Sequence, residues 1–308
     1  MHMARSKAKT LQPQAVIERS RPRRDLESAL EGLTEALQTD DRSAKTNVYL
    51  GDDVLMSYIP FFDTHFFLDS RDRGVTPHLC QGTVWEQGTT EAVRALVRPG
   101  QNVIDVGACV GWYTALFARA VGPTGRVLAV EANPRLAGLL ARSVEEYRTV
   151  SVVNKAVGNE DKKTVFVSDD MTWAPGNTVG AAAGAGAVPV TYVRLDTLLQ
   201  EGQWARARVD VIKIDVEGHE WQVWQGMQKT VAANPNLEVF LEINVRRDII
   251  NGIDPIEFYD DLQRKFENMF TINPDDGLLV HTSPSELLES TGNVLLYLSN
   301  QPLSGLDE

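Results

Sequence analysis

The chain has 308 residues, of which 43% are hydrophobic and 23% charged, with a formal net charge of −12 at pH 7 and a pI of about 5.0. This length and apolar content are sufficient for one large domain with its own core. The acidic balance argues against broad, nonspecific binding to nucleic acid or to an anionic membrane, because both ligands are negatively charged. No apolar run approaches the ~20 residues of a spanning helix, and the N-terminus lacks the apolar core of a signal peptide.

The chain contains few cysteines. Only Cys80 and Cys109 occur, so no disulfide framework is expected. Cys109 lies inside a glycine-bearing turn, where we expect it to act as a small apolar residue. Together with the missing signal core, this predicts a soluble, cytoplasmic protein.

An arm and a cap are predicted ahead of the main domain. In residues 1–24 the basic side chains far outnumber the acidic ones, which is typical of a solvated, mobile arm; contact with an anionic partner is the alternative. Residues 25–87 are predicted to form a short amphipathic helix followed by a small β cap. The helix is expected over residues 25–38, and the strands over residues 48–50, 54–56 and 65–68.

From residue 88 to residue 308 the pattern alternates between strands and helices, as in a parallel α/β sheet. Helices are predicted with Thr90 as a cap, over residues 111–121 and 221–231, and from Pro134 and Asp254. Strands are predicted over residues 102–106, 126–130, 150–157, 209–216 and 237–243, with a terminal pair at 269–272 and 294–298.

Residues 164–193 interrupt this alternation. Strands are predicted over residues 164–167 and 188–193, and an Ala/Gly-rich run over residues 180–187 lies between them. Such a run buries little apolar surface. A lid over the site and a long hairpin loop fit it equally well.

The most informative segment is the apolar strand at residues 103–106, which runs into a turn that opens a helix. The turn reads D-x-G-x-x-x-G, with Gly107 and Gly111. Glycine lets a backbone approach a ligand closely, because a Cβ would collide with it. The next strand ends in Glu131, whose carboxylate can accept two hydrogen bonds from a ribose diol. These features predict a nucleotide pocket at the carboxyl edge of the sheet.

The same turn restricts which nucleotide fits. A dinucleotide site reads G-x-G-x-x-G and seats a pyrophosphate at the helix N-terminus. Here the third glycine is missing, and the bulky Trp112 stands where the helix begins. A nucleoside without phosphate, such as S-adenosyl-L-methionine (SAM), therefore fits better.

A second polar cluster follows the fourth strand, in the segment KIDVEGHE at residues 213–220. Ligands bind at this edge of a doubly wound sheet, and a crowd of acids suits a cationic ligand such as a sulfonium with an ammonium group. The alternative is that these acids cap the following helix, because negative charge is favourable at a helix N-terminus.

Taken in order, seven segments of the chain resemble the FkbM family of class I SAM-dependent methyltransferases. They are GTVWE (82–86), VIDVGACVGWYT (103–114), VEANP (130–134), NKAVG (154–158), RLDTLL (194–199), IKIDVEGHE (212–220) and LEIN (241–244). The chain departs from the family at Cys109 and Val110, where Asn followed by Ile or Val is common. That change removes a side-chain amide and leaves the loop shape intact. Residues before 80 match only weakly.

The resemblance implies a Rossmann-like, seven-stranded class I methyltransferase sheet with an N-terminal helix and β cap. It implies methyl transfer from SAM, most often to a hydroxyl oxygen. Within the SAM site it implies four groups of residues: Asp105, Gly107, Ala108, Gly111, Trp112 and Tyr113 in the loop and helix start beside the methionine part; Glu131 and Ala132 at the ribose; Asn133 and the segment Asn154, Lys155 and Ala156 around the adenine; and Glu86, Asp215 and Glu217 near the amino group or sulfonium.

The predicted chemistry needs a base, because a hydroxyl acceptor loses its proton during attack and a group with a pKa of about 7 suits that step. His219 is the candidate, and Asp215 and Glu242 complete the predicted catalytic set. Glu217, Glu220 and Glu242 are fallbacks that could orient the histidine. The alternative for His219 is a helix-capping residue outside the pocket.

No metal is predicted. Asp215, Glu217 and Glu242 offer the hard oxygen ligands that a divalent ion prefers, but no tight ligand spacing supports such a site. Loss of activity with EDTA, restored by magnesium, would reverse this expectation.

The expected partner is a small hydroxylated acceptor, either a natural product or a sugar, with no nucleic acid and no membrane; a homodimer is compatible with the sequence. One rival is a nucleic-acid (tRNA) methyltransferase, motivated by the basic arm. Such amino-group enzymes usually carry Asp or Asn followed by Pro-Pro and an aromatic residue, where this chain has DVEG at 215–218. The other rival is a nucleotide-dependent oxidoreductase, against which the missing third glycine counts.

Overall fold

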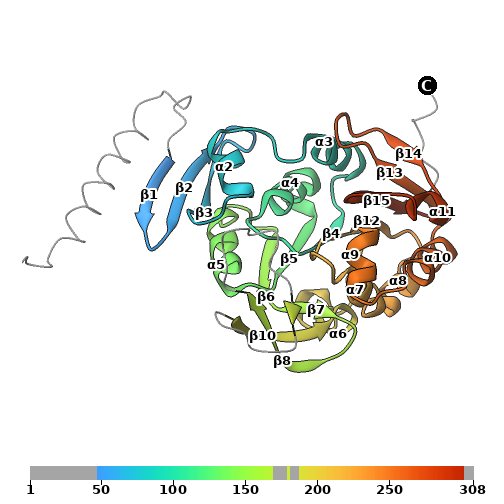
Figure 1. Ribbon diagram of the computed structural model, residues 1–308. Helices are drawn as coiled ribbons and strands as arrows, with labels where there is room; N and C mark the ends of the chain where they lie inside the picture. Colours follow the sequence, from blue (N-terminus) through green and yellow to red (C-terminus); the bar gives the residue numbers. More distant parts are fainter. Residues whose placement is uncertain (1–46, 169–178, 181–186, 302–308) are drawn as a thin grey trace, which may run out of the picture. The chain divides into compact units, whose positions relative to one another are not determined.

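The computed structural model describes residues 47–168, 179–180 and 187–301, and Lys45–Glu308 form one compact unit (Figure 1). The arm predicted at residues 1–24, the helix predicted at 25–38 and nearly all of the Ala/Gly-rich run lie outside the described residues. The domain boundary predicted at residue 87 stays a prediction. Within the described part of the chain, no helix has the length and apolar character to cross a membrane.

The centre of the fold is an eight-stranded sheet with the order β14-β13-β15-β12-β11-β4-β5-β6. The run from β12 to β6 is parallel, whereas β15, β13 and β14 are added in antiparallel pairs. All seven predicted strands are present, and β14 adds an eighth at the edge. The bounds are β4 Asn102–Val106, β5 Arg126–Glu131, β6 Val150–Asn154, β11 Val211–Ile214, β12 Glu238–Ile243, β13 Asn268–Ile272, β14 Leu279–His281 and β15 Val294–Ser299.

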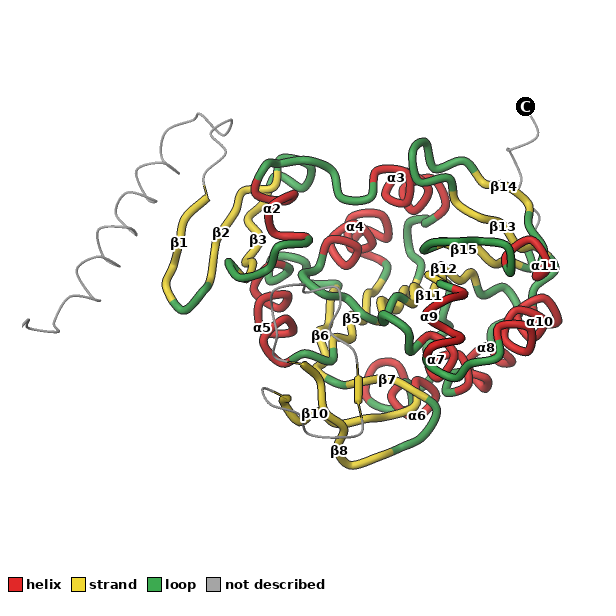
Figure 2. Tube along the Cα trace, in the orientation of Figure 1, coloured by secondary structure: helices red, strands yellow, loops and turns green. Residues whose placement is uncertain are grey.

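The parallel strands are mostly apolar because helices cover both faces of the sheet (Figure 2). Successive side chains point to opposite faces, so Val103 joins one core and Ile104 the other. The first core contains α3 (Gln87–Leu96), α4 (Trp112–Val121) and α5 (Pro134–Ser143). The second contains α6 (Leu195–Leu198), α7 (Glu220–Gln225) and α10 (Pro255–Lys265). The α/β fold expected from the sequence is confirmed.

The predicted β cap is a three-stranded antiparallel sheet of β1 (Asn47–Gly51), β2 (Val54–Ile59) and β3 (Thr64–Asp69). Its aromatic side chains enter the first core, where the Phe62 ring lies 4.8 Å from the Trp112 ring, centroid to centroid. Helix α2 (Val75–Cys80) follows the cap.

The interruption in the main domain forms a second, four-stranded sheet with the order β7-β10-β8-β9. The predicted strand at residues 150–157 is therefore divided: β6 ends at Asn154, and β7 begins a different sheet. The strands predicted at 164–167 and 188–193 are confirmed as an antiparallel pair. The bounds are β7 Ala156–Gly158, β8 Lys162–Ser168, β9 Val179–Gly180 and β10 Ala187–Arg194.

The sequence predicted that Thr90 caps a helix, and this prediction is wrong. Helix α3 begins three residues earlier, with Glu86 at its N-cap position. The Thr90 hydroxyl donates to the Trp85 carbonyl at 2.7 Å and accepts from Trp112 Nε1 at 2.9 Å. A tertiary hydrogen bond therefore explains this threonine, which is fully buried.

The other predicted helix starts hold, with one division. Asn133 and Asp254 cap α5 and α10 through side-chain oxygens that accept backbone N–H groups. The helix predicted at 221–231 is instead α7 followed by α8 (Gln228–Ala233). Gly226 ends α7, and a Cβ there would lie 1.8 Å from the Gly158 carbonyl oxygen, so a close approach to β7 fixes the break. The remaining short elements are α9 (Val245–Ile250), α11 (Pro284–Leu287), η1 (Gly122–Thr124) and η3 (Gly202–Trp204).

The turn after β4 has no room for a side chain. Gly107 has a φ of +83°, and a Cβ built on it would lie 1.8 Å from the Asp215 carbonyl oxygen. We expect Gly107→Ala to lower the free energy of unfolding by about 3 kcal/mol or more, because steric overlap adds to backbone strain. Urea unfolding measures this loss.

Gly252→Ala is the matched control. Gly252 has a φ of +75°, but nothing lies within 4 Å of its Cβ position. Its substitution should cost about 1–2 kcal/mol from the left-handed backbone alone. Equal losses in the two variants would contradict the close approach at Gly107.

Candidate active site

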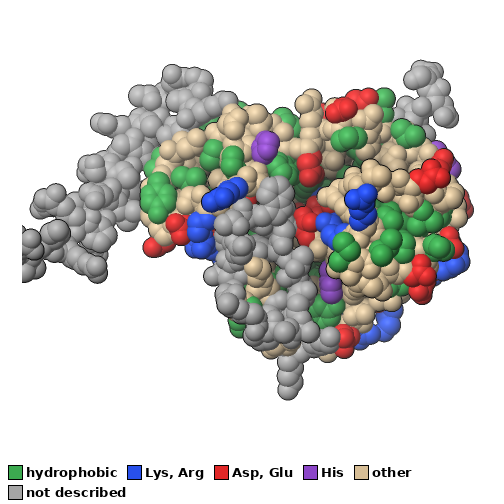
Figure 3. Space-filling model, viewed as in Figure 1, with side chains coloured by type: hydrophobic (Ala, Val, Ile, Leu, Met, Phe, Trp, Pro, Cys, Tyr) green, Lys and Arg blue, Asp and Glu red, His purple; other side chains and the backbone are tan. Residues whose placement is uncertain are grey.

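A cavity of about 260 Å³ opens at the carboxyl ends of β4, β5, β11 and β12. Figure 3 shows acidic and basic side chains close together near the middle of the visible face. Most of the residues singled out from the sequence line this cavity, so strand ends far apart in the chain do meet. They are Glu86, Gly107, Ala108, Trp112, Tyr113, Glu131, Ala132, Ala156, Asp215, Glu217, His219 and Glu242.

Four of the predicted cofactor residues lie behind the cavity wall. Asp105 is fully buried, and its Oδ2 accepts a hydrogen bond from the Thr114 hydroxyl at 2.6 Å. Gly111 is the N-cap residue of α4, with a φ of +97°. Asn133 caps α5, and Asn154 Nδ2 donates to the carbonyl oxygens of residues 131 and 132 at 2.9 and 2.8 Å. These residues hold the backbone from which the lining side chains project.

Glu131 is the best-anchored carboxylate of the cavity. Its Oε1 accepts from the Asn133 N–H at 2.7 Å, and its Oε2 accepts from the Cys109 N–H at 2.9 Å. The two bonds fix the plane of the carboxylate and leave each oxygen with a further lone pair. Because the side chain is buried, its pKa is raised to about 7 despite these bonds.

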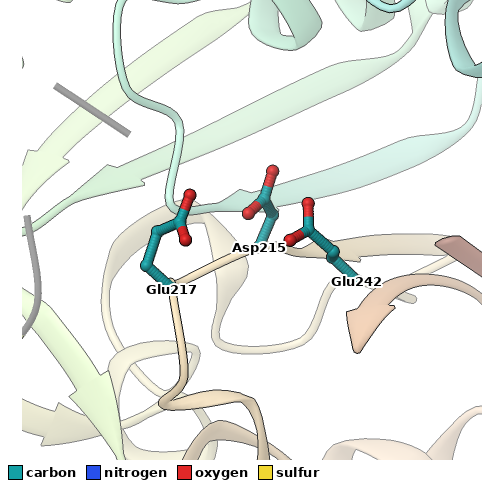
Figure 4. Close-up of side chains that lie close together, drawn as sticks. All are labelled: Asp215, Glu217 and Glu242. Atoms are coloured by element: carbon teal, nitrogen blue, oxygen red, sulfur yellow. The ribbon is translucent and has the colours of Figure 1, made fainter. Parts of the chain in front are cut away.

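Three carboxylates converge at the other end of the cavity. Figure 4 shows Asp215 and Glu217, from the loop after β11, beside Glu242 of β12. One oxygen from each lies within 4.8 Å of the others. Burial, followed by the neighbouring Asp215, raises the pKa of Glu217 to about 7 and that of Glu242 to about 9. The cluster therefore holds protons near neutral pH when no cation occupies the cavity.

Two cationic side chains contact this cluster. Lys213 Nζ donates to Asp215 Oδ2 at 2.9 Å. Arg247, at the start of α9, donates to Glu217 and, at 3.1 Å, to Glu242. In the described part of the chain these three acids are the ones whose ligand atoms lie close enough to hold a metal ion, and each also contacts a lysine or an arginine. The chain itself thus supplies part of the compensating charge.

His219 lies in the cavity wall and at the N-cap of α7 at the same time. Its Nε2 is 2.7 Å from the hydroxyl of Tyr192 on β10. Its side chain makes no capping hydrogen bond. The alternative that His219 is a helix-capping residue outside the pocket is therefore wrong, although His219 does occupy the N-cap position of α7.

Glu220 was predicted as one of the residues that could orient His219, but its carboxylate holds the preceding loop. Its Oε1 accepts from the backbone N–H groups of Val216 and Gly218 at 3.1 and 3.0 Å. Only 1% of the residue is exposed. Glu220 therefore shapes the turn that presents Glu217 and His219.

The structure adds residues that the sequence had not assigned. Trp85, Asn293 and Lys213 line the cavity, as does Lys155, which the sequence had placed only within the segment beside the adenine. A lone lysine in an otherwise apolar strand was the available signal for Lys213. Arg247 carried no such signal, because its contacts depend on the direction in which α9 leaves the sheet.

We expect the unliganded protein to lose thermal stability as pH rises from 6 to 9. The folded-state pKa of Glu242 is about 9, against 4.5 ordinarily, so the folded chain holds a proton that the unfolded chain has released. Glu242→Gln has no proton to lose, and its Tm should fall less over this range. The exposed Glu257→Gln is the control, and parallel Tm curves for all three proteins would contradict the expectation.

Comparison with known families and proteins agrees with this geometry. The family model described as "Methyltransferase FkbM domain" matches residues 105–299. Protein-L-isoaspartate O-methyltransferase of Aeropyrum pernix is 43% identical over 65 residues, which cover 21% of this chain and 25% of that protein. Ribosomal RNA large subunit methyltransferase E of Sorangium cellulosum is 30% identical over 89 residues, covering 29% and 42%. The matched segments span less than half of either relative.

Solved structures show more distant likenesses. The O-methyltransferase TomG from Streptomyces achromogenes, in complex with SAM, is 14% identical and has a TM-score of 0.40, with 70% of this chain and 80% of that chain covered. An O-methyltransferase from Bacillus cereus, in complex with SAH, is 15% identical with a TM-score of 0.39, and the match covers 69% and 80%. Likeness at this level carries nothing about the acceptor.

Proposed function

The chain belongs to the FkbM methyltransferase domain family and uses SAM as its methyl donor, and on this premise we propose that it methylates a hydroxyl oxygen of a small natural product or sugar. The observation that carries the proposal is the end of the cavity beyond the Gly107 turn. There a histidine whose ring is held by Tyr192 lines the same cavity as three clustered carboxylates. A hydroxyl acceptor needs such a proton-accepting group, whereas the donor needs a negative environment.

The residues present fit SAM. Glu131 retains lone pairs for a ribose diol, and apolar Ala156 and Val157 line the wall beside it, where an adenine would lie. At the opposite end, the charged groups of Glu86, Lys213 and Asp215 match an amino acid that carries both an ammonium and a carboxylate.

The protein's part in the reaction is alignment and proton transfer. When bound, SAM supplies a methyl group on a sulfonium, which is already a strong electrophile. The cavity holds donor and acceptor for in-line displacement. SAM held in this cavity would supply the methyl group to the acceptor oxygen and would leave with the electron pair of the C–S bond, and the hydroxyl proton would pass to the His219 ring. Asp215, which lines the same cavity, then stabilises the imidazolium through its negative charge.

We propose a cytoplasmic location and no nucleic-acid partner. Cys80 and Cys109 are both free, as is usual in a reducing compartment. The carboxylates at the cavity would repel a polyanion. The natural-product or sugar acceptor would then come from a biosynthetic pathway in the same compartment.

Glu131→Ala should weaken binding of S-adenosylhomocysteine by about 10- to 100-fold, because hydrogen bonds to a buried carboxylate are lost. Isothermal titration calorimetry measures the affinity. Glu145→Ala, at an exposed position that does not line the cavity, serves as the control and should bind normally. Unchanged affinity in Glu131→Ala would remove the ribose role.

His219→Ala should lower turnover by about 10²- to 10⁴-fold, as expected for loss of a general base. The substrate is first identified by a SAM-turnover screen of hydroxylated small molecules, read by mass spectrometry as the gain of one methyl group. Affinity for S-adenosylhomocysteine should stay within about twofold of the wild type, because His219 acts on the acceptor hydroxyl and does not bind the donor. A twofold change corresponds to less than about 0.5 kcal/mol. His281→Ala, at an exposed histidine on β14, is the matched control. Normal turnover without His219 would exclude it as the base.

A further inference from the structure

Lys213 is a buried ammonium with unused hydrogen-bonding capacity. Only 3% of its side chain is exposed, yet the residue lines the cavity. An ammonium has three N–H donors, and within the described part of the chain the one hydrogen bond of Lys213 goes to Asp215. Buried donors are normally satisfied, so two of them remain for a ligand acceptor.

The surroundings of Lys213 keep it positively charged. Burial alone would lower its pKa, but the carboxylates of Asp215, Asp105 and Glu86 raise it above its ordinary value. Its Nζ also lies 4.5 Å from the centroid of the Tyr113 ring, and the negative face of the ring attracts a cation. A charged, buried donor of this kind binds an anionic acceptor strongly.

The sheet places Lys213 at the methionine end of the cavity. In the β11–β4 register Lys213 lies opposite Asp105, two residues before Gly107. The Gly107 turn touches the Asp215 carbonyl, two residues beyond Lys213. The other lysine of the cavity wall, Lys155, directly follows β6, and β6 is two strands away from β4 in the sheet. Its Nζ lies 3.8 Å from a carboxylate oxygen of Glu201.

A cation and anions are therefore set side by side at one end. The Glu86 carboxylate accepts from the Tyr113 hydroxyl at 2.5 Å, while Lys213 lies over the ring of the same tyrosine. An α-amino acid presents an ammonium and a carboxylate on one carbon atom, which matches this arrangement.

We propose that Lys213 binds the α-carboxylate of the methionine part of SAM, while Glu86 faces its ammonium group. The proposal rests on the placement of SAM given under the proposed function. It assigns to Lys213 the selection of a donor that retains its carboxylate. Lys213 is then a binding residue and takes no part in proton transfer.

The test compares SAM with decarboxylated SAM, which keeps the sulfonium and the amine and lacks only the carboxylate. Calorimetry gives the affinity of each ligand for the full chain and for Lys213→Gln. We expect the wild type to prefer SAM by about tenfold or more, as one charged hydrogen-bonded contact implies. Lys213→Gln should lose about 10- to 100-fold for SAM and stay within about threefold for decarboxylated SAM.

Lys155→Gln is the matched control, because it removes the other lysine of the cavity. It should change the affinity for both ligands by the same factor and leave the preference intact. Lys213→Arg, which keeps the charge, should retain part of the preference.

Equal losses for both ligands in Lys213→Gln would show a purely structural counter-ion and overturn the proposal. If that variant does not fold, equal affinity of the wild type for both ligands overturns it just as well. Failure of the wild type to bind either ligand would instead remove the donor site itself, which is a distinguishable result.

Discussion

The ion pair between Lys213 and Asp215 is the constraint on which the site depends. An ammonium in the middle of a central strand is very costly unless carboxylates surround it. The β11–β4 register supplies Asp105 directly opposite, and the chain supplies Asp215 at the strand end. Because the Asp215 carbonyl in turn excludes any side chain at position 107, the glycine turn and the acidic cluster are fixed against each other.

Much of this arrangement could be predicted because chemistry at strand ends follows from the topology. Glu131, Asp215 and Glu242 lie at or just beyond the ends of three parallel strands, and such ends meet at one edge of a sheet. Apolar runs located the strands, and Pro134 and Asp254 located helix starts, because both signals are local. His219 follows the same logic, since the turn after β11 carries it to the cavity.

The features that escaped prediction depend on contacts between distant segments. Thr90 reads as a helix cap in isolation, but its hydroxyl is used by Trp112 and Trp85. The break between α7 and α8 comes from the close approach of Gly226 to Gly158, which no local propensity encodes. Arg247 meets Glu217 only because Asn244 caps a short helix and so sets its direction. Sequence patterns report periodicity and caps, whereas these contacts require the assembled sheet.

The charges at the cavity are unbalanced in a way that suits the donor. Arg247 is shared among Glu217, Glu220 and Glu242, so no one of these carboxylates has a full counter-charge. Burial and the neighbouring Asp215 raise the pKa values of Glu217 and Glu242, and Arg247 offsets only part of that shift. A protein core selected for stability alone would replace such a cluster with apolar residues. Its retention is understandable where the ligand brings the missing positive charge, because the same repulsion that destabilises the empty cluster then favours a sulfonium over a neutral sulfur.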